Sequence, residues 1–141
     1  MNKLLAMTVL IMTLGTTLAQ AQRCGNPNDR AVVVHVQDGA FDLLLPADAE
    51  SNVTAALELP RVEALKVAHH GSADEGLPAM LERTAPQVAA IEVGRNSYGH
   101  PAPSTLGALR VVPRLVRTDR DGTVRLRVAE GRMRLEGADG S

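Results

Sequence analysis

Short apolar runs typical of β-strands alternate along this chain with short amphipathic runs typical of helices. The runs AVVVHVQ (31–37) and FDLLLP (41–46) flank the turn dipeptide Asp38-Gly39 and predict a hairpin. Strands alternating with helices predict an α/β fold, in which helices pack on a β-sheet. The other predicted strands span 64–68, 88–93, 114–117 and 123–128, and the predicted helices span 50–59, 77–84 and 104–110, the last capped by Ser104.

The length of the chain limits this pattern to one domain. It has 141 residues, of which 45% are hydrophobic and 22% are charged, with a formal net charge of -1. Phe41 and Tyr98 are its only aromatic residues besides histidine. The core must therefore be aliphatic, and the chain lacks the several exposed rings of a base-stacking platform.

The first 21 residues have the pattern of a secretory signal peptide. A short start containing Lys3 precedes an apolar stretch (4–18), and Ala19-Gln20-Ala21 has the small-x-small pattern that signal peptidase reads. We expect cleavage, export to the periplasm or the medium, and no stable membrane span afterwards; the alternative is an uncleaved membrane anchor. The predicted organisation is a signal peptide (1–21), a linker (22–30), a domain (31–135) and a tail (136–141).

Charge is distributed unevenly along the predicted domain. Residues 38–92 contain ten acidic and three basic side chains, whereas residues 93–135 contain nine arginines and three acidic side chains. The planar guanidinium of arginine suits phosphate and carboxylate groups. The basic part predicts either polyanion binding or an ordinary solvated strand face.

Polar side chains follow three successive predicted strands. Asp48 follows the first, His69 and His70 follow the second, and Tyr98 and His100 lie in the loop after the third. Ligands of open α/β sheets gather outside the carboxyl ends of the strands. Because carboxylate and imidazole are ligands that zinc and manganese accept, this edge is a possible metal site.

Each of these residues also has a structural interpretation. Asp48 could form a turn or cap the following helix, and His100 could fix its loop through the rigid peptide to Pro101. His35 lies in the middle of a strand and is expected to be a surface or packed residue. Spacing leaves open which of His69 and His70 is a ligand.

Four motifs resemble a known family in their order and spacing. They are LLLPADAE (43–50), ALKVAHHGS (64–72), VGRNSYGHP (93–101) and RTDRDG (117–122). Together they resemble the C-terminal half of the metallo-β-lactamase-type domain of the ComEC family, the competence proteins of DNA uptake. The resemblance runs from about residue 28 to residue 128 and implies half of an αββα sandwich.

The resemblance also implies a chemistry, which is hydrolysis of a phosphodiester of DNA at one or two divalent metal ions, zinc or manganese. By this resemblance Asp48 is a metal-bridging carboxylate and His69 or His70 is a ligand. The implied catalytic residues are His100 and Asp119, and the implied substrate-binding residues are Arg95, Tyr98, Arg117 and Arg125.

The chain departs from the family in lacking the His-x-His-x-Asp-His motif of the first half, because its four histidines are His35, His69, His70 and His100. We therefore expect impaired catalysis, a partner polypeptide that supplies the missing half, or self-association through an open sheet edge. The alternative function is a non-catalytic exported module that binds DNA or another polyanion through its Arg-rich C-terminal strands, with structural histidines.

Overall fold

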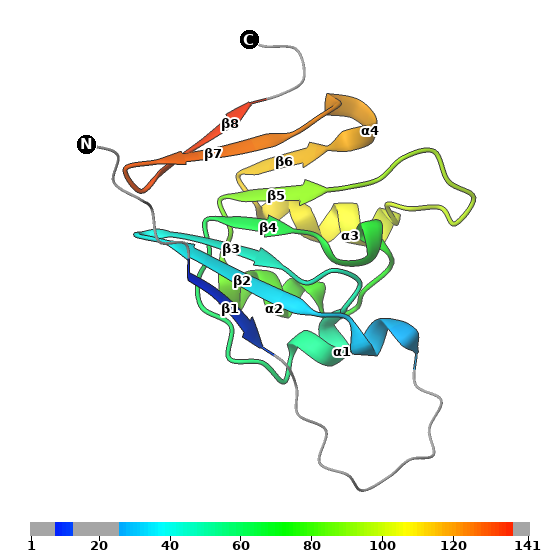
Figure 1. Cartoon of the computed structure of the whole chain (residues 1–141). Coiled ribbons are helices and arrows are strands. Elements are labelled where there is room, and N and C mark those ends of the chain that lie inside the picture. Colours follow the sequence, from blue (N-terminus) through cyan, green and yellow to red (C-terminus); the bar gives the residue numbers. More distant parts are fainter. Residues whose placement is uncertain (1–7, 13–25, 137–141) are drawn as a thin grey trace, which may run out of the picture.

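The structure is a computed structural model that describes residues 8–12 and 26–136. Within these residues one mixed sheet has the strand order β1-β2-β3-β4-β5-β6, and a separate two-stranded ribbon has the order β7-β8 (Figure 1). β1 to β3 are antiparallel neighbours, whereas β3 to β6 are parallel. The strands are β1 (Thr8–Met12), β2 (Val33–Asp38), β3 (Phe41–Leu45), β4 (Ala64–Lys66), β5 (Val88–Ile91), β6 (Arg114–Arg117), β7 (Arg125–Ala129) and β8 (Arg132–Glu136).

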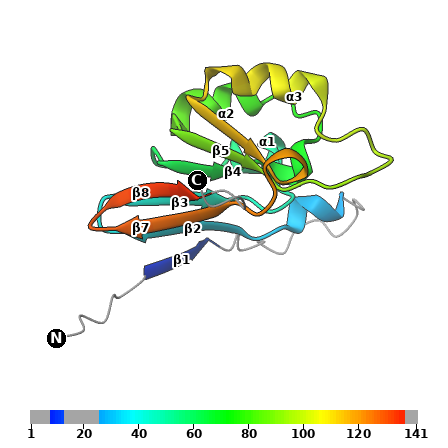
Figure 2. The ribbon, with the colours of Figure 1, turned by 90° about the horizontal axis from the view of Figure 1, so that it is seen from above.

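Helices cover one face of the sheet, and the ribbon lies on the side of the other face (Figure 2). This arrangement confirms the predicted α/β fold with helices packed on a sheet. The α-helices are α1 (Ser51–Thr54), α2 (Leu77–Thr84), α3 (Pro103–Ala108) and α4 (Thr118–Asp121), and the 3-10 helices are η1 (Pro27–Arg30), η2 (Ala68–Gly71) and η3 (Leu109–Val111).

The core lies between the sheet and the helices and is aliphatic, as the composition requires. Its most completely buried large side chains include Leu44, Leu65, Ile91 and Leu109. Burial of each such side chain stabilises the fold by about 1.5–3 kcal/mol relative to an exposed position. On the opposite face of the sheet, Leu43 is only half-buried.

The ribbon covers part of that opposite face. Val124 and Leu126 line a cavity of about 270 Å³ together with Leu43 and Leu45 of β3. At the other end of the ribbon, a Cβ atom built on Gly131 would lie 3.7 Å from the Cβ of Ala40 in the β2–β3 turn. The ribbon thus packs its apolar side against the sheet, as the alternation of Val124, Leu126 and Val128 with arginines predicts.

Several predicted elements match the structure closely. β2 and β3 form the predicted hairpin, but its two-residue turn is Gly39-Ala40 and not Asp38-Gly39, because Asp38 still pairs with Phe41; Gly39 has a φ of 62°. α2 spans the predicted residues because Leu77, Met80 and Leu81 fall on its buried face. β6 also spans the predicted residues.

Other elements differ from the prediction. The predicted helix 50–59 is wrong beyond Thr54, because Arg83 of α2 donates to the carbonyls of Ala55 (3.3 Å) and Leu57 (2.7 Å). Side-chain donors thus replace helical N–H groups there. Ser104 is not the N-cap of α3, which begins at Pro103 after Ala102.

Two elements lie at the predicted boundaries of the domain. η1 lies within the predicted linker, and Glu136, predicted as the first tail residue, is the last residue of β8. Of the predicted signal peptide, the structure describes only Thr8–Met12, which pairs with β2. The signal peptide stays a prediction. Among residues 8–12 and 26–136, no helix combines the length and apolar character needed to cross a bilayer.

Candidate functional site

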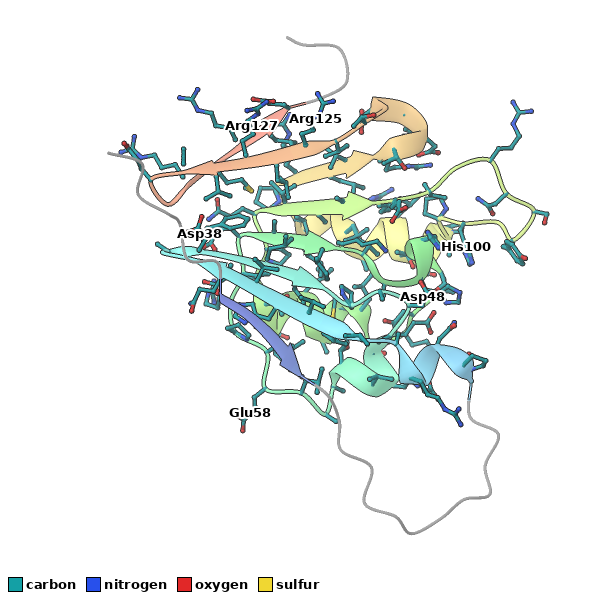
Figure 3. All side chains as sticks on the ribbon, viewed as in Figure 1. Asp38, Asp48, Glu58, His100, Arg125 and Arg127 are labelled. Carbon is teal, nitrogen blue, oxygen red and sulfur yellow. The ribbon has the colours of Figure 1, made fainter. Side chains whose placement is uncertain are left out.

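Three loops meet at the carboxyl-terminal edge of β3, β4 and β5 (Figures 1 and 3). Because these strands are parallel neighbours, the segments that follow them leave from the same side of the sheet. Asp48 follows β3, His69 and His70 follow β4, and His100 lies in the loop after β5. The structure therefore brings together the residues whose spacing had suggested a site.

The turn after β4 has an unusual backbone conformation. His69, His70 and Gly71 have φ values of 46°, 53° and 82°, which form a left-handed run. Side chains with a Cβ rarely adopt this region, and such conformations cluster at functional sites. Neighbouring segments hold the run in place, since Ala47 accepts from the His69 N–H (3.0 Å) and Ala102 donates to the Gly71 carbonyl (2.7 Å).

His70 faces the carboxylate of Asp48. Its Nδ1 atom lies 2.7 Å from the carbonyl oxygen of Glu92. A carbonyl only accepts, so Nδ1 carries a proton and Nε2 of the neutral ring keeps its lone pair. This Nε2 atom lies 4.0 Å from Oδ1 of Asp48, and the two side chains are 47% and 42% exposed.

His69 is held by a different set of partners. Its Nδ1 atom lies 2.8 Å from Oε1 of Glu50, which also accepts a hydrogen bond from Ser72 Oγ. The Nδ2 atom of Asn28 lies 3.3 Å from each ring nitrogen of His69. These contacts fix the ring and leave His69 less exposed than His70.

The loop after β5 is organised by Asn96. Its Nδ2 donates to the carbonyls of Gly94 and His100 (both 2.9 Å), and its Oδ1 accepts from the backbone N–H groups of Tyr98 and His100 (both 3.1 Å). The ring of His100 lies 5.5 Å from that of His69 and 6.0 Å from that of Tyr98, which is 83% exposed. The loop therefore presents Tyr98 and His100 beside the histidines.

Asp119 and Arg117 form a pair of their own. Nε and Nη2 of Arg117 donate to the two carboxylate oxygens of Asp119 at 3.0 and 2.7 Å. The Arg117 guanidinium thereby holds the pKa of the Asp119 carboxyl below its usual value. Both groups are engaged with each other, so the pair has a structural explanation, and its predicted catalytic and substrate-binding roles stay predictions.

The remaining predicted substrate-binding arginines lie apart from one another. Arg95 is exposed in the loop between β5 and α3. Arg125 lies on the ribbon, well away from Asp48 and His100 (Figure 3). The structure thus does not bring Arg125 to the edge where the histidines gather.

The carboxylate and imidazole groups at the edge are of the types that bind a divalent metal. They are too few to form a complete metal site. A structural zinc site has four protein ligands and a catalytic one usually has three. Within the part of the chain that the structure describes, no group of three or more His, Cys, Asp or Glu side chains could hold a metal ion. Among the described residues the edge therefore offers two side chains of a metal-binding type, Asp48 and His70, which by themselves are too few for a metal site.

Sequence reasoning missed the residues that orient the histidines. Glu50 stands two positions after Asp48 and could have been singled out as a second carboxylate on the same loop. Asn28 gave no such signal, because it lies in the segment predicted as a linker. His35 of β2, which lies opposite Leu44 of β3, is packed and has Nε2 2.6 Å from Asp42 Oδ1, as expected for a structural histidine.

The structure defines an α/β domain with histidine and aspartate side chains at the carboxyl-terminal edge of its parallel strands. Two known proteins are similar to this chain in sequence. The chain is 30% identical to ComE operon protein 3 of Bacillus subtilis over 106 residues, which cover 71% of this chain and 14% of that protein. It is 31% identical to Recombination protein 2 of Haemophilus influenzae over 115 residues, which cover 79% of this chain and 15% of that protein.

The chain thus spans about one seventh of the length of these two relatives. The similarity agrees with the motif resemblance to competence proteins, and it does not test the metallo-β-lactamase domain. No family model matches the chain, and no solved structure matches it.

Proposed function

We propose that this chain is a DNA-handling domain of the competence type, whose chemistry is the hydrolysis of a phosphodiester. Asp48 and His70 are two ligands of a divalent ion, zinc or manganese. The observation that carries the proposal is the 4.0 Å approach of His70 Nε2 to Asp48 Oδ1 at the carboxyl edge of the parallel strands. The similarity to two competence-related proteins supports it.

The backbone partner of His70 supports its assignment as the ligand over His69. Metal-binding histidines almost always donate their second ring N–H to a carboxylate or a backbone carbonyl. His70 donates in this way to the carbonyl of Glu92, and its Nε2 atom faces the carboxylate of Asp48. His69 also has its Nδ1 occupied, by Glu50, yet its ring is packed against Asn28.

Asp48 and His70 would hold a divalent ion together with ligands from elsewhere, and the chemistry that such an ion supplies is an activated water for hydrolysis of the phosphodiester. The chain's own residues would position the substrate. His100 lies within 5.5 Å of the His69 ring and could donate a proton to the leaving oxygen or bind a phosphate oxygen. Its loop is fixed by Asn96, which gives it a defined position.

We propose that further ligands come from a second polypeptide that carries the His-x-His-x-Asp-His motif, since this chain has no such motif. Turnover by this chain alone should then be slow. Export, as the pattern in residues 1–21 predicts, is part of the proposal, and DNA taken up from outside the cell would be the substrate.

The test is cleavage of DNA by the purified chain after addition of zinc or manganese. We expect slow metal-dependent cleavage that Asp48→Asn and His70→Gln abolish. Asp38→Asn is the matched control, because Asp38 lies beside the β2–β3 turn, at the opposite end of the strands from Asp48 (Figure 3). Cleavage that all three variants retain, or no cleavage above the rate of the buffer, contradicts the proposal.

The alternative is a non-catalytic module that binds a polyanion through its Arg-rich C-terminal strands. The exposed arginines of β7 and β8 favour it. It predicts DNA binding without metal-dependent cleavage, and it predicts no effect of Asp48→Asn or His70→Gln on any activity.

A further inference from the structure

The β7–β8 ribbon has an arginine face and an apolar face. Its register places Arg127 directly opposite Arg134, Arg125 opposite Glu136 and Ala129 opposite Arg132. Because directly opposed residues of an antiparallel pair share a face, one face carries four arginines. These arginines, which we call the arginine face, are Arg125, Arg127, Arg132 and Arg134, and all four are exposed.

The other face of the ribbon is turned toward the sheet. Leu126 and Leu135 are directly opposed and half-buried, as are Val128 and Met133. Leu126 lines the cavity against β3 to β5. The ribbon therefore uses its apolar side to hold itself on the domain, and its arginines are left to solvent (Figure 3).

The arginine face carries an excess of positive charge. Glu136 accepts a hydrogen bond from Arg127 Nε (2.8 Å) and is the one acidic residue of β7 and β8. Arg127 and Arg134 are opposed like charges, which destabilise a strand pair. A ligand with closely spaced negative charges would remove this repulsion.

We propose that the arginine face binds the phosphate backbone of duplex nucleic acid. The guanidinium fork of arginine matches phosphate in geometry, and a duplex carries closely spaced phosphates along both strands. The face has no aromatic side chain, so it has no ring on which an unpaired base could stack. The contacts are therefore to phosphates, and the binding is independent of sequence.

A membrane surface is the less suitable partner for the same face. Protein segments that bind at a bilayer interface bury apolar side chains among the lipids. The larger apolar side chains of the ribbon, such as Leu126, are on the side of the sheet, and within β7 and β8 the small Ala129 is the one apolar side chain beside the arginines. The arginine face thus offers charge without an apolar anchor.

This binding site is separate from the Asp48–His70 edge and does not depend on hydrolysis (Figure 3). The two proposals can fail independently. Asp48→Asn with His70→Gln should leave duplex binding unchanged, and loss of the arginines should leave metal binding unchanged.

The experiment measures binding of the full chain to a fluorescent DNA duplex by anisotropy over a range of salt concentrations. The test variant is Arg127→Gln with Arg134→Gln. The control variant is Arg61→Gln with Arg110→Gln, which removes the same charge from exposed positions outside the ribbon. A thermal melt establishes that each variant is folded, and Arg125→Gln with Arg132→Gln serves as a second test pair if the first one unfolds.

We expect the test variant to bind at least tenfold more weakly and the control variant to stay within about twofold of the unmodified chain. The slope of log affinity against log salt should fall by about 1.8 for two lost phosphate contacts. Equal losses in the test and control variants would overturn the proposal. Tighter binding to the single strand, or to phosphatidylserine vesicles, than to the duplex would also overturn it.

Discussion

The Nε2 atom of His70 lies 4.0 Å from Oδ1 of Asp48, although the two residues follow different strands. The approach depends on the left-handed run at His69, His70 and Gly71, which turns the chain after β4 back toward the loop after β3. The backbone of this turn should therefore matter to the site as much as its side chains do.

Gly71→Ala should destabilise the fold more than Gly99→Ala does. Both glycines have nearly the same φ, 82° and 81°, so alanine costs roughly 1–2 kcal/mol at each. A Cβ on Gly71 would lie 2.7 Å from the Cβ of Pro101, whereas one on Gly99 meets nothing within 4 Å. Chemical denaturation should show an additional loss of about 1–3 kcal/mol for Gly71→Ala. Equal losses would show that Pro101 does not constrain the turn.

Glu50→Gln should lower the free energy of unfolding by about 2 kcal/mol, because Glu50 accepts charge-assisted hydrogen bonds from His69 and Ser72. The matched control is Glu58→Gln, at an exposed position away from the site (Figure 3), which should change stability by less than about 0.5 kcal/mol. Urea denaturation of both variants measures the difference. Similar changes in the free energy of unfolding for the two variants would show that Glu50 does not help to hold His69.

Asp119→Asn should destabilise the protein at neutral pH by on the order of 1 kcal/mol, the range of partly exposed ion pairs. The Arg117 guanidinium lowers the pKa of Asp119 in the folded state. The stabilisation is therefore complete above the ordinary carboxyl pKa and is lost as pH falls through the lowered one. Urea denaturation from neutral to strongly acidic pH should show the two proteins converging in stability. A difference that stays constant down to acidic pH contradicts this ion pair.

Asn96→Ala should loosen the loop that presents Tyr98 and His100. It removes the acceptor of both backbone N–H groups. Amide hydrogen exchange at these two residues should become at least about tenfold faster, as expected for the loss of a hydrogen bond worth about 1–1.5 kcal/mol. Ser97→Ala in the same loop is the control. Unchanged exchange at Tyr98 and His100 would mean that another contact fixes the loop.

Much of the fold could be predicted because the local pattern and the tertiary contacts agree. The apolar positions Leu77, Met80 and Leu81 match the buried face of α2, and Leu44 and Leu65 lie in the short apolar strands that form the core. The end of α1 could not be predicted, because it depends on Arg83, which is distant in sequence. The last predicted strand ends at residue 128, although residues 132–136, which form β8, also alternate as a strand does.

The sequence predicts which residues gather at the candidate site, but it does not predict how their side chains are oriented. Spacing placed Asp48, His70 and His100 at the same edge, since parallel strands deliver their carboxyl ends together. It could not predict the different surroundings of His69 and His70, because these depend on two consecutive positive φ values and on the Glu92 carbonyl. Neither is visible in the sequence.

The most direct test of the central claim is the affinity of the chain for zinc and for manganese, measured by equilibrium dialysis with elemental analysis. Asp48→Asn and His70→Gln should each weaken binding at least tenfold, whereas Asp38→Asn should bind as the unmodified chain does. Metal affinity that is unchanged in both Asp48→Asn and His70→Gln would contradict the claim that these two residues form a metal-binding pair.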